Sequence, residues 1–206
     1  MFKHGEIKLV KTSAISAMLI GLCILSQSLW IYTKAWTGQT LIEAAWERSV
    51  RDQTHHKPWP WADTYPVGKL NVPSLDIELY LLQGDTGQAL AFAPGMTVYE
   101  TELTNEQHIA STYLLQAHRD THFDFLPKLK RGEQLSLEML GEKKHFYVHQ
   151  HKIFETPEFS TPSDIEHDLL LLSSCYPFSS DLERDRADIP TNTDKQRYVV
   201  ALLPSG

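Results

Sequence analysis

The chain has 206 residues, of which 42% are hydrophobic and 22% are charged, and its formal net charge is −7. This composition is ordinary for a globular protein and excludes global disorder, low-complexity sequence and collagen-like sequence. The length predicts one domain with a short appendage, because ordinary domains contain roughly 100 to 200 residues.

The first predicted element is a membrane-spanning helix at residues 14–32. This stretch has no charged side chain and is long enough to cross a bilayer. Lys3, Lys8 and Lys11 precede it and only Lys34 follows closely, so the positive-inside rule places the N-terminus in the cytoplasm. A cleaved signal peptide and a lipoprotein signal are the alternatives. The apolar stretch exceeds the usual signal-peptide core of about 7 to 15 residues, and Leu22 precedes Cys23 where a lipidation site needs a small residue. We therefore expect a single-pass membrane anchor and an extracytoplasmic domain.

Charge changes sign after this segment. Residues 1–34 carry a net charge of +3 and the remaining 172 residues carry −10. An acidic exported domain is a poor match for nucleic acid, whose phosphates require neutralisation by Lys and Arg. Cys23 lies within the apolar segment, so Cys175 is the single cysteine of the exported part and cannot form a disulfide within it. Such a thiol is either buried and inert or kept for its reactivity.

Residues 35–61 are expected to join the anchor to the exported domain. Apolar residues recur at helical spacing between positions 37 and 50, which predicts a juxtamembrane helix. Prolines then exclude a continuous helix, and Trp59 and Trp61 beside them are interpreted as packing or membrane-interface residues. We expect the folded domain to comprise residues 62–206.

From residue 65 onward the pattern changes from helical to alternating, which is typical of half-buried strands. Strands are predicted at 75–81, 112–117, 135–139, 144–154, 169–174 and 197–203, with shorter pieces at 70–72 and 96–98 and brief helices at 87–92 and 123–129. About eight short strands with few helices between them predict a mainly β fold, a closed or nearly closed β-barrel.

Three residues with catalytic potential lie at the ends of these predicted strands. His118 follows one strand directly, Cys175 follows another, and Arg197 opens the last. If the three strands are neighbours, the three side chains converge on one rim of the barrel. A free thiol is only a few per cent thiolate at neutral pH and needs a proton acceptor. We therefore expect Cys175 to act as nucleophile, His118 as general acid and base, and Arg197 to stabilise a developing oxyanion.

Residues around these three positions have alternative interpretations. His122 is either a second imidazole or a packing residue, and Asp120 either orients His118 or caps a helical turn. Arg184 and Arg186 are rival candidates for the role of the arginine. Asp120 is included among the candidate supporting residues.

Three further histidines, His145, His149 and His151, occupy odd positions of the strand predicted at 144–154 and are expected on one face. Three imidazoles are potential ligands of a transition metal, but no carboxylate or thiol occurs at matching spacing. We expect an exposed polar strand face, and no metal or cofactor. A tethered, non-catalytic metal-binding domain is the alternative function.

Four motifs and their order carry a resemblance to a known family: Trp59-Pro-Trp61, His118-Arg-Asp-Thr-His-Phe123, Ser174-Cys-Tyr-Pro-Phe178 and Arg197-Tyr-Val-Val200. The sequence resembles the sortases, membrane-anchored cysteine transpeptidases, and in particular the proteobacterial class usually called GN sortases. The family motif Thr-Leu-x-Thr-Cys corresponds to Leu171-Leu-Ser-Ser-Cys175 here. Ser174 keeps a hydroxyl beside the nucleophile and is a second supporting residue, whereas Leu171 lacks one.

The resemblance implies a sortase-like barrel that acts on an exported protein. It implies cleavage of a C-terminal sorting signal of the Leu-Pro-x-Thr-Gly type through a thioester on Cys175, and transfer to an amine-bearing acceptor at the cell surface. An exported cysteine peptidase that hydrolyses its acyl-enzyme is the alternative. Neither chemistry requires a cofactor.

Overall fold

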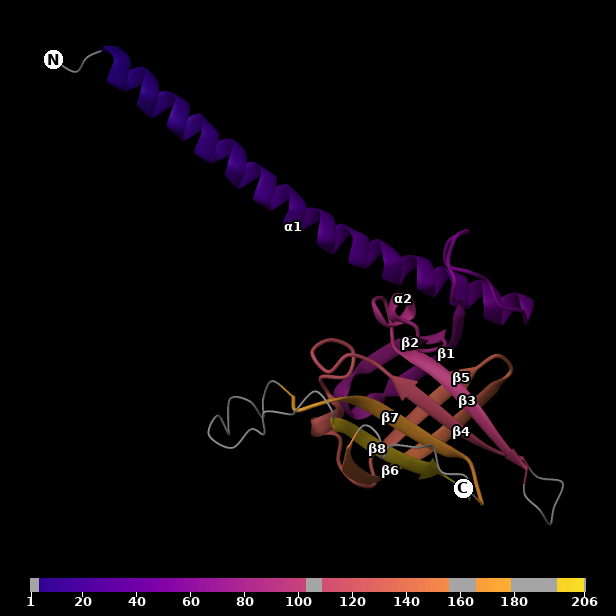
Figure 1. The fold of residues 1–206 in the computed structure, drawn as a ribbon. Helices are drawn as coiled ribbons and strands as arrows, with labels where there is room; N and C mark the ends of the chain where they lie inside the picture. Colours follow the sequence, from indigo (N-terminus) through magenta and orange to yellow (C-terminus); the bar gives the residue numbers. More distant parts are fainter. Residues whose placement is uncertain (1–3, 103–108, 156–165, 179–195, 206) are drawn as a thin grey trace, which may run out of the picture. The chain divides into compact units, whose positions relative to one another are not determined.

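The computed structural model describes residues 4–102, 109–155, 166–178 and 196–205 (Figure 1). The helices and strands are, in chain order, α1 (His4–Asp52), β1 (Pro66–Val72), η1 (Pro73–Leu75), β2 (Ile77–Gln83), α2 (Gly87–Leu90), β3 (Gly95–Glu102), β4 (Ile109–Gln116), η2 (Leu126–Lys128), β5 (Gln134–Met139), β6 (Glu142–Glu155), β7 (Leu169–Tyr176) and β8 (Gln196–Pro204). The chain divides between Thr40 and Leu41 into two compact units, and the second contains every strand.

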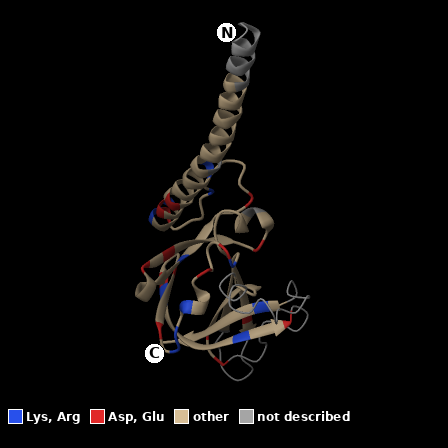
Figure 2. Ribbon diagram, turned by 90° about the vertical axis from the view of Figure 1, so that its left-hand side faces the viewer, with Lys and Arg blue, Asp and Glu red and all other residues tan. Residues whose placement is uncertain are grey.

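Helix α1 contains the apolar stretch of the first unit. No Lys, Arg, Asp or Glu occurs between Ala14 and Thr33 (Figure 2), and this helix is long and apolar enough to cross a membrane, a property that signal sequences share. Its large side chains, such as those of Met18 and Trp30, are exposed within the unit, as lipid-facing residues would be. The helix predicted at 37–50 is present, but it is continuous with the apolar segment.

The last three turns of α1 pack in the second unit. Ile42 is fully buried in a small apolar cluster with Leu82, Ala89 and Ala93, which come from β2 and from the α2 region. Tyr80 packs against this cluster, and its hydroxyl donates to a carboxylate oxygen of Glu43, 3.2 Å away. Burial, followed by the negative charge of Glu43, raises the pKa of Tyr80 to about 12. This end of the helix is therefore a structural part of the second unit.

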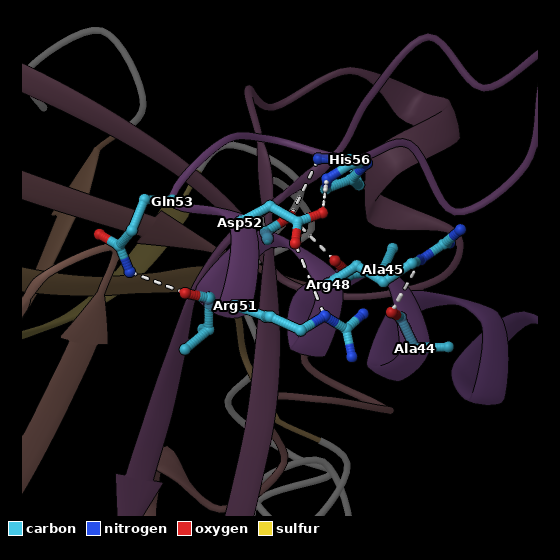
Figure 3. Close-up of polar contacts among 9 residues, drawn as sticks. Ala44, Ala45, Arg48, Arg51, Asp52, Gln53 and His56 are labelled. Atoms are coloured by element: carbon cyan, nitrogen blue, oxygen red, sulfur yellow. Dashed lines mark hydrogen bonds and ion pairs between the residues drawn. The ribbon is translucent and has the colours of Figure 1, made fainter.

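A network of polar contacts fixes the chain where α1 ends (Figure 3). The fully buried Ser49 hydroxyl donates to the Ala45 carbonyl at 2.8 Å and accepts from the His56 backbone N–H at 2.9 Å. Asp52 Oδ2 lies 2.8 Å from His56 Nε2, and its other oxygen lies 3.6 Å from Arg51 Nε. These contacts link the last turn of the helix to the segment that follows it, so the chain has a defined path toward β1.

The eight strands close into a barrel in the order β1-β2-β3-β4-β7-β8-β6-β5, which confirms the predicted mainly β fold and closed barrel. Neighbouring strands are antiparallel, except that β2 and β3, and β4 and β7, run parallel. Strand β7 thus lies between β4 and β8 (Figure 1). Alternate side chains fill the interior with a single core, whose fully buried members include Leu70, Leu115, Leu137, Phe146, Leu172 and Val200.

Some predicted boundaries differ from the structure. The short piece expected at 96–98 is part of an eight-residue strand, β3. The sequence does not indicate its full length, because Val98 and Tyr99 are both apolar and exposed and so interrupt the alternation of apolar and polar residues. The helix expected at 123–129 is reduced to the single 3-10 turn η2. The helix expected at 87–92 is the four-residue α2.

Candidate active site

Strand β7 carries Cys175 on the outer face of the barrel. Leu170 and Leu172 are fully buried in the core, and side chains of a strand alternate between its two faces. Leu171 packs instead in a separate apolar cluster on the outer face. Cys175 has the parity of Leu171, and its thiol is exposed. The thiol therefore projects outward from a strand whose other face is locked into the core.

Arg197 lies directly opposite Cys175 in the antiparallel pairing of β7 with β8. Residues paired in this way project on the same face, with their Cβ atoms about 4.5 to 5.5 Å apart. The half-buried Arg197 side chain is therefore within reach of a group bound at the Cys175 thiol. Phe154 of β6 pairs with Arg197 on the other side and continues this row of side chains.

His118 follows β4, the other neighbour of β7. The parallel register pairs Gln116 with Ser173, and the Ala117 N–H still donates to the Ser173 carbonyl at 3.3 Å. One residue further along, His118 is level with Cys175, and its side chain is exposed. The parity of Leu114, which packs on the outer face, continues through Gln116 to His118. The strands that carry or precede these residues, β4, β7 and β8, are neighbours, as the prediction of a shared rim for the thiol, the imidazole and the guanidinium requires.

Ser174 joins the two strands just below this rim. Its hydroxyl is fully buried and donates to the Ala117 carbonyl at 2.8 Å. The residue before the thiol is therefore hydrogen-bonded to the residue before the imidazole. The Ser174 hydroxyl therefore has a structural role, which is to link β7 to the end of β4.

Arg119 makes a second connection between the same two segments, which no pattern in the sequence predicts. Its Nη1 donates to the Pro177 carbonyl at 2.7 Å, and its Nε lies 3.4 Å from Asp120 Oδ2. Asp120 therefore contacts Arg119, whereas helix η2 begins further along the chain, with Phe125 at its N-cap position.

His122 is half-buried on the turn that follows His118. Burial lowers the pKa of His122, the nearby His118 lowers it further, and a hydrogen bond to the Phe92 backbone opposes both effects. The Thr121 hydroxyl lies 3.4 Å from its Nδ1. His122 therefore lies between His118 and the segment after α2, in surroundings that favour its neutral form.

Comparison with known proteins identifies the family. A family model described as the sortase domain matches residues 70–201, which is more than half of the chain. The chain belongs to the sortase family. It is 27% identical to sortase D of Bacillus subtilis (strain 168) over 139 residues, which are 66% of this chain and 68% of that relative. Sortases are known as cysteine transpeptidases.

Solved structures share the fold. A pilus-related sortase C of Group B Streptococcus superimposes with a TM-score of 0.51 at 21% identity, covering 68% of each chain. The sortase C1 lid-mutant of Streptococcus agalactiae gives 0.53 at 17% identity, covering 68% of this chain and 70% of that one. A sortase D5 transpeptidase of Clostridium perfringens gives 0.51 at 15% identity, with coverage of 68% and 79%.

An aromatic cluster supports the rim of this sortase from inside the barrel. The Tyr176 and Tyr198 rings are stacked with their centroids 6.3 Å apart, and Phe178 meets Tyr198 edge-on at 5.2 Å. The Tyr198 hydroxyl lies 2.9 Å from Nδ1 of His151. Burial lowers the pKa of His151, and the positive charge of Arg131 lowers it further. These residues alternate with Cys175 and Arg197, so they brace the strands that carry the candidate site.

The prediction that His145, His149 and His151 lie on one face of β6 is wrong. A β-bulge between Val148 and Gln150 changes the parity of the strand. Beyond the bulge, His151 turns toward Tyr198 and the core, while His145 and His149 remain exposed. The described part of the chain contains no group of three or more His, Cys, Asp or Glu side chains placed to hold a metal ion.

The two rival arginines, Arg184 and Arg186, lie outside the described residues. Within the described residues, Arg197 is the arginine paired with Cys175.

Proposed function

We propose that this sortase is a membrane-anchored cysteine transpeptidase of the proteobacterial GN class, with Cys175 as nucleophile, His118 as general acid and base, and Arg197 as oxyanion-stabilising residue. The observation that carries the proposal is the register of three neighbouring strands. It pairs Cys175 directly with Arg197 and sets His118 at the same level beyond β4. The GN assignment rests on the four sequence motifs and their order.

In the proposed acylation step, the Cys175 sulfur attacks a peptide carbonyl carbon of the substrate. The carbonyl π electrons move to oxygen, and the Arg197 guanidinium stabilises this oxyanion, a contribution of about 2.7 to 4 kcal/mol for one such donor in other enzymes. Collapse breaks the C–N bond, and the His118 imidazolium donates its proton to the departing amine. The products are a thioester on Cys175 and the free C-terminal peptide.

In the proposed transfer step, an acceptor amine attacks the thioester carbonyl while neutral His118 removes a proton from the amine nitrogen. The tetrahedral intermediate collapses with cleavage of the C–S bond, so the sulfur leaves as thiolate and a new amide joins donor and acceptor. His118 ends this half-reaction protonated, which returns the pair to its starting state.

An apolar area on the outer face below the rim favours a peptide as the substrate. Leu114, Leu171 and Val199 come from the same three strands and form a buried apolar cluster there, which is bordered by the partly buried Phe154, Leu169 and Ala201. We propose that the apolar part of a C-terminal sorting signal of the Leu-Pro-x-Thr-Gly type packs on this side, with its scissile carbonyl at Cys175. The donor is an exported protein, and the acceptor is an amine at the cell surface.

The location follows from the charge and hydropathy of the N-terminal segment. We propose that α1 crosses the inner membrane once, with Lys3, Lys8 and Lys11 in the cytoplasm. The barrel then lies on the periplasmic side, where exported substrates become available. The domain assignment is an anchor at 1–34, a juxtamembrane segment at 35–61 and a catalytic domain at 62–206.

The experiment incubates the purified full-length protein with a sorting-signal peptide and a primary amine, and identifies products by mass spectrometry. We expect a peptide–amine adduct from the wild type, none from Cys175→Ala, and a rate at least about 100-fold lower from folded His118→Ala. Product formation by Cys175→Ala would overturn the proposal. Free acid alone, without adduct, would identify a hydrolytic peptidase instead.

A further inference from the structure

The ladder between β4 and β7 ends before it reaches the candidate catalytic residues. Its last contacts are the Ala117 N–H to the Ser173 carbonyl and the Ser174 hydroxyl to the Ala117 carbonyl. His118 itself opens a turn, in which its carbonyl accepts from the Phe123 N–H at 3.2 Å. The position of His118 relative to Cys175 therefore depends on contacts beyond the sheet.

Arg119 supplies such a contact. Its guanidinium spans 58 residues of sequence to reach the Pro177 carbonyl at 2.7 Å, a length typical of a strong charge-assisted hydrogen bond. The side chain is only 28% exposed, and Asp120 lies against its Nε. Pro177 is buried, and Phe178 after it is anchored in the core, so the acceptor carbonyl is a fixed point.

The contact encloses the candidate pair. Arg119 immediately follows His118, and Pro177 lies two residues after Cys175. The Ser174–Ala117 bond closes the same pair of segments from below, so two hydrogen bonds bracket the thiol and the imidazole. A bracket of this kind limits how far one segment can move from the other.

We propose that Arg119 is a positioning residue that fixes His118 beside Cys175 by clamping the turn after β4 to the segment after β7. The inference rests on the proposed function, because it requires Cys175 and His118 to react as a pair. The guanidinium acts through His118, and small displacements of a reacting group cost up to about 100-fold in rate.

The test measures alkylation of Cys175 by iodoacetamide at pH 7 in full-length protein carrying Cys23→Ser, which leaves one thiol. An ordinary thiol is only about 3% thiolate at this pH, so a well-placed partner can raise the rate by roughly 30-fold at most. We expect Arg119→Ala to lower the rate about tenfold. Arg119→Lys recovers part of the loss, because an ammonium can still donate to the Pro177 carbonyl.

Arg131 is the matched control. Its Nε donates to the His149 backbone carbonyl at 2.7 Å, which is the same kind of bond at another place on the barrel. Arg131→Ala should leave the alkylation rate within twofold of the wild-type rate. An equal loss in Arg119→Ala and Arg131→Ala would overturn the inference and indicate a general effect on the fold.

A double-mutant cycle separates positioning from stability. With His118→Ala as background, Arg119→Ala should lower the alkylation rate no further, because its target is already absent. A further loss in that background, or a rate in folded Arg119→Ala equal to that of the wild type, would refute the clamp. If His118→Ala alone leaves the rate unchanged, the proposed function is what fails.

Discussion

Ser174 and Ser173 are adjacent, fully buried serines on opposite faces of β7, and they predict opposite responses to alanine. Ser174→Ala removes the 2.8 Å hydrogen bond to the Ala117 carbonyl. Losing such a bond costs about 0.5 to 1.5 kcal/mol, and up to about 3 kcal/mol when the acceptor stays buried without a replacement. We therefore expect Ser174→Ala to lower the free energy of unfolding by about 1 to 3 kcal/mol.

Ser173→Ala is the internal control for this prediction. The Ser173 hydroxyl has no hydrogen-bond partner among the described residues, so it was removed from water without compensation. Replacing this hydroxyl by hydrogen should leave the free energy of unfolding unchanged or raise it by about 1 kcal/mol. The two variants lose the same atoms from neighbouring positions, which cancels the effect of side-chain volume.

The measurement is thermal unfolding of both full-length variants in the same detergent, with near-UV circular dichroism as the signal. For a folded unit of this size, 1 kcal/mol corresponds to about 2 to 4 °C in Tm. Equal losses in the two variants, or a Ser174→Ala protein as stable as the wild type, would refute the hydrogen-bond argument. Because Ser174 also holds the residue before His118, its alanine variant should lose activity, which an acylation assay can measure.

Three further predictions concern packing, pH and backbone space. Ile42→Ala, which empties a fully buried site, should cost about 2 to 5 kcal/mol, whereas Leu41→Ala on the more exposed side of the helix should cost less than about 1 kcal/mol, as urea unfolding would show. Because burial lowers the pKa of His151 below 6.5, the unfolded chain binds more protons, so stability should fall as the pH drops below about 6.5; His151→Asn should flatten this dependence of Tm between pH 7 and 5. A Cβ at Gly95 would lie 2.1 Å from a backbone carbonyl oxygen, so Gly95→Ala should prevent normal folding, while Gly87→Ala in an open helical position should raise Tm slightly.

The barrel was predictable because its strands bury one face. The alternation at 75–81 and 135–139 and the apolar run at 169–174 reflect a period of two against one core, and the structure has strands at all three places. The sequence indicates only part of β3, because Val98 and Tyr99 are adjacent, apolar and both exposed, so apolar and polar residues do not alternate there. The helical turns at 87–92 and 123–129 were overestimated because short helices depend on tertiary contacts.

The candidate site was partly predictable. Residues at strand ends, with the right chemistry and order, pointed to His118, Cys175 and Arg197, and the three strands are indeed neighbours. Two features had no sequence signal. The bond from Arg119 joins a side chain to a backbone carbonyl, which any residue possesses. The β-bulge in β6 adds one residue to a strand and reverses the parity on which the histidine prediction depended.

The alternation along β7 has a consequence for how this protein can evolve. Inward positions such as Leu170 and Leu172 are constrained by close packing, whereas outward positions such as Leu171 and Ser173 are free of that central core. Under the proposed function, changes at the outward positions of this strand can alter substrate preference while the inward positions maintain stability. A saturation-mutagenesis map of β7 should accordingly show a tolerance to substitution that alternates between successive residue positions.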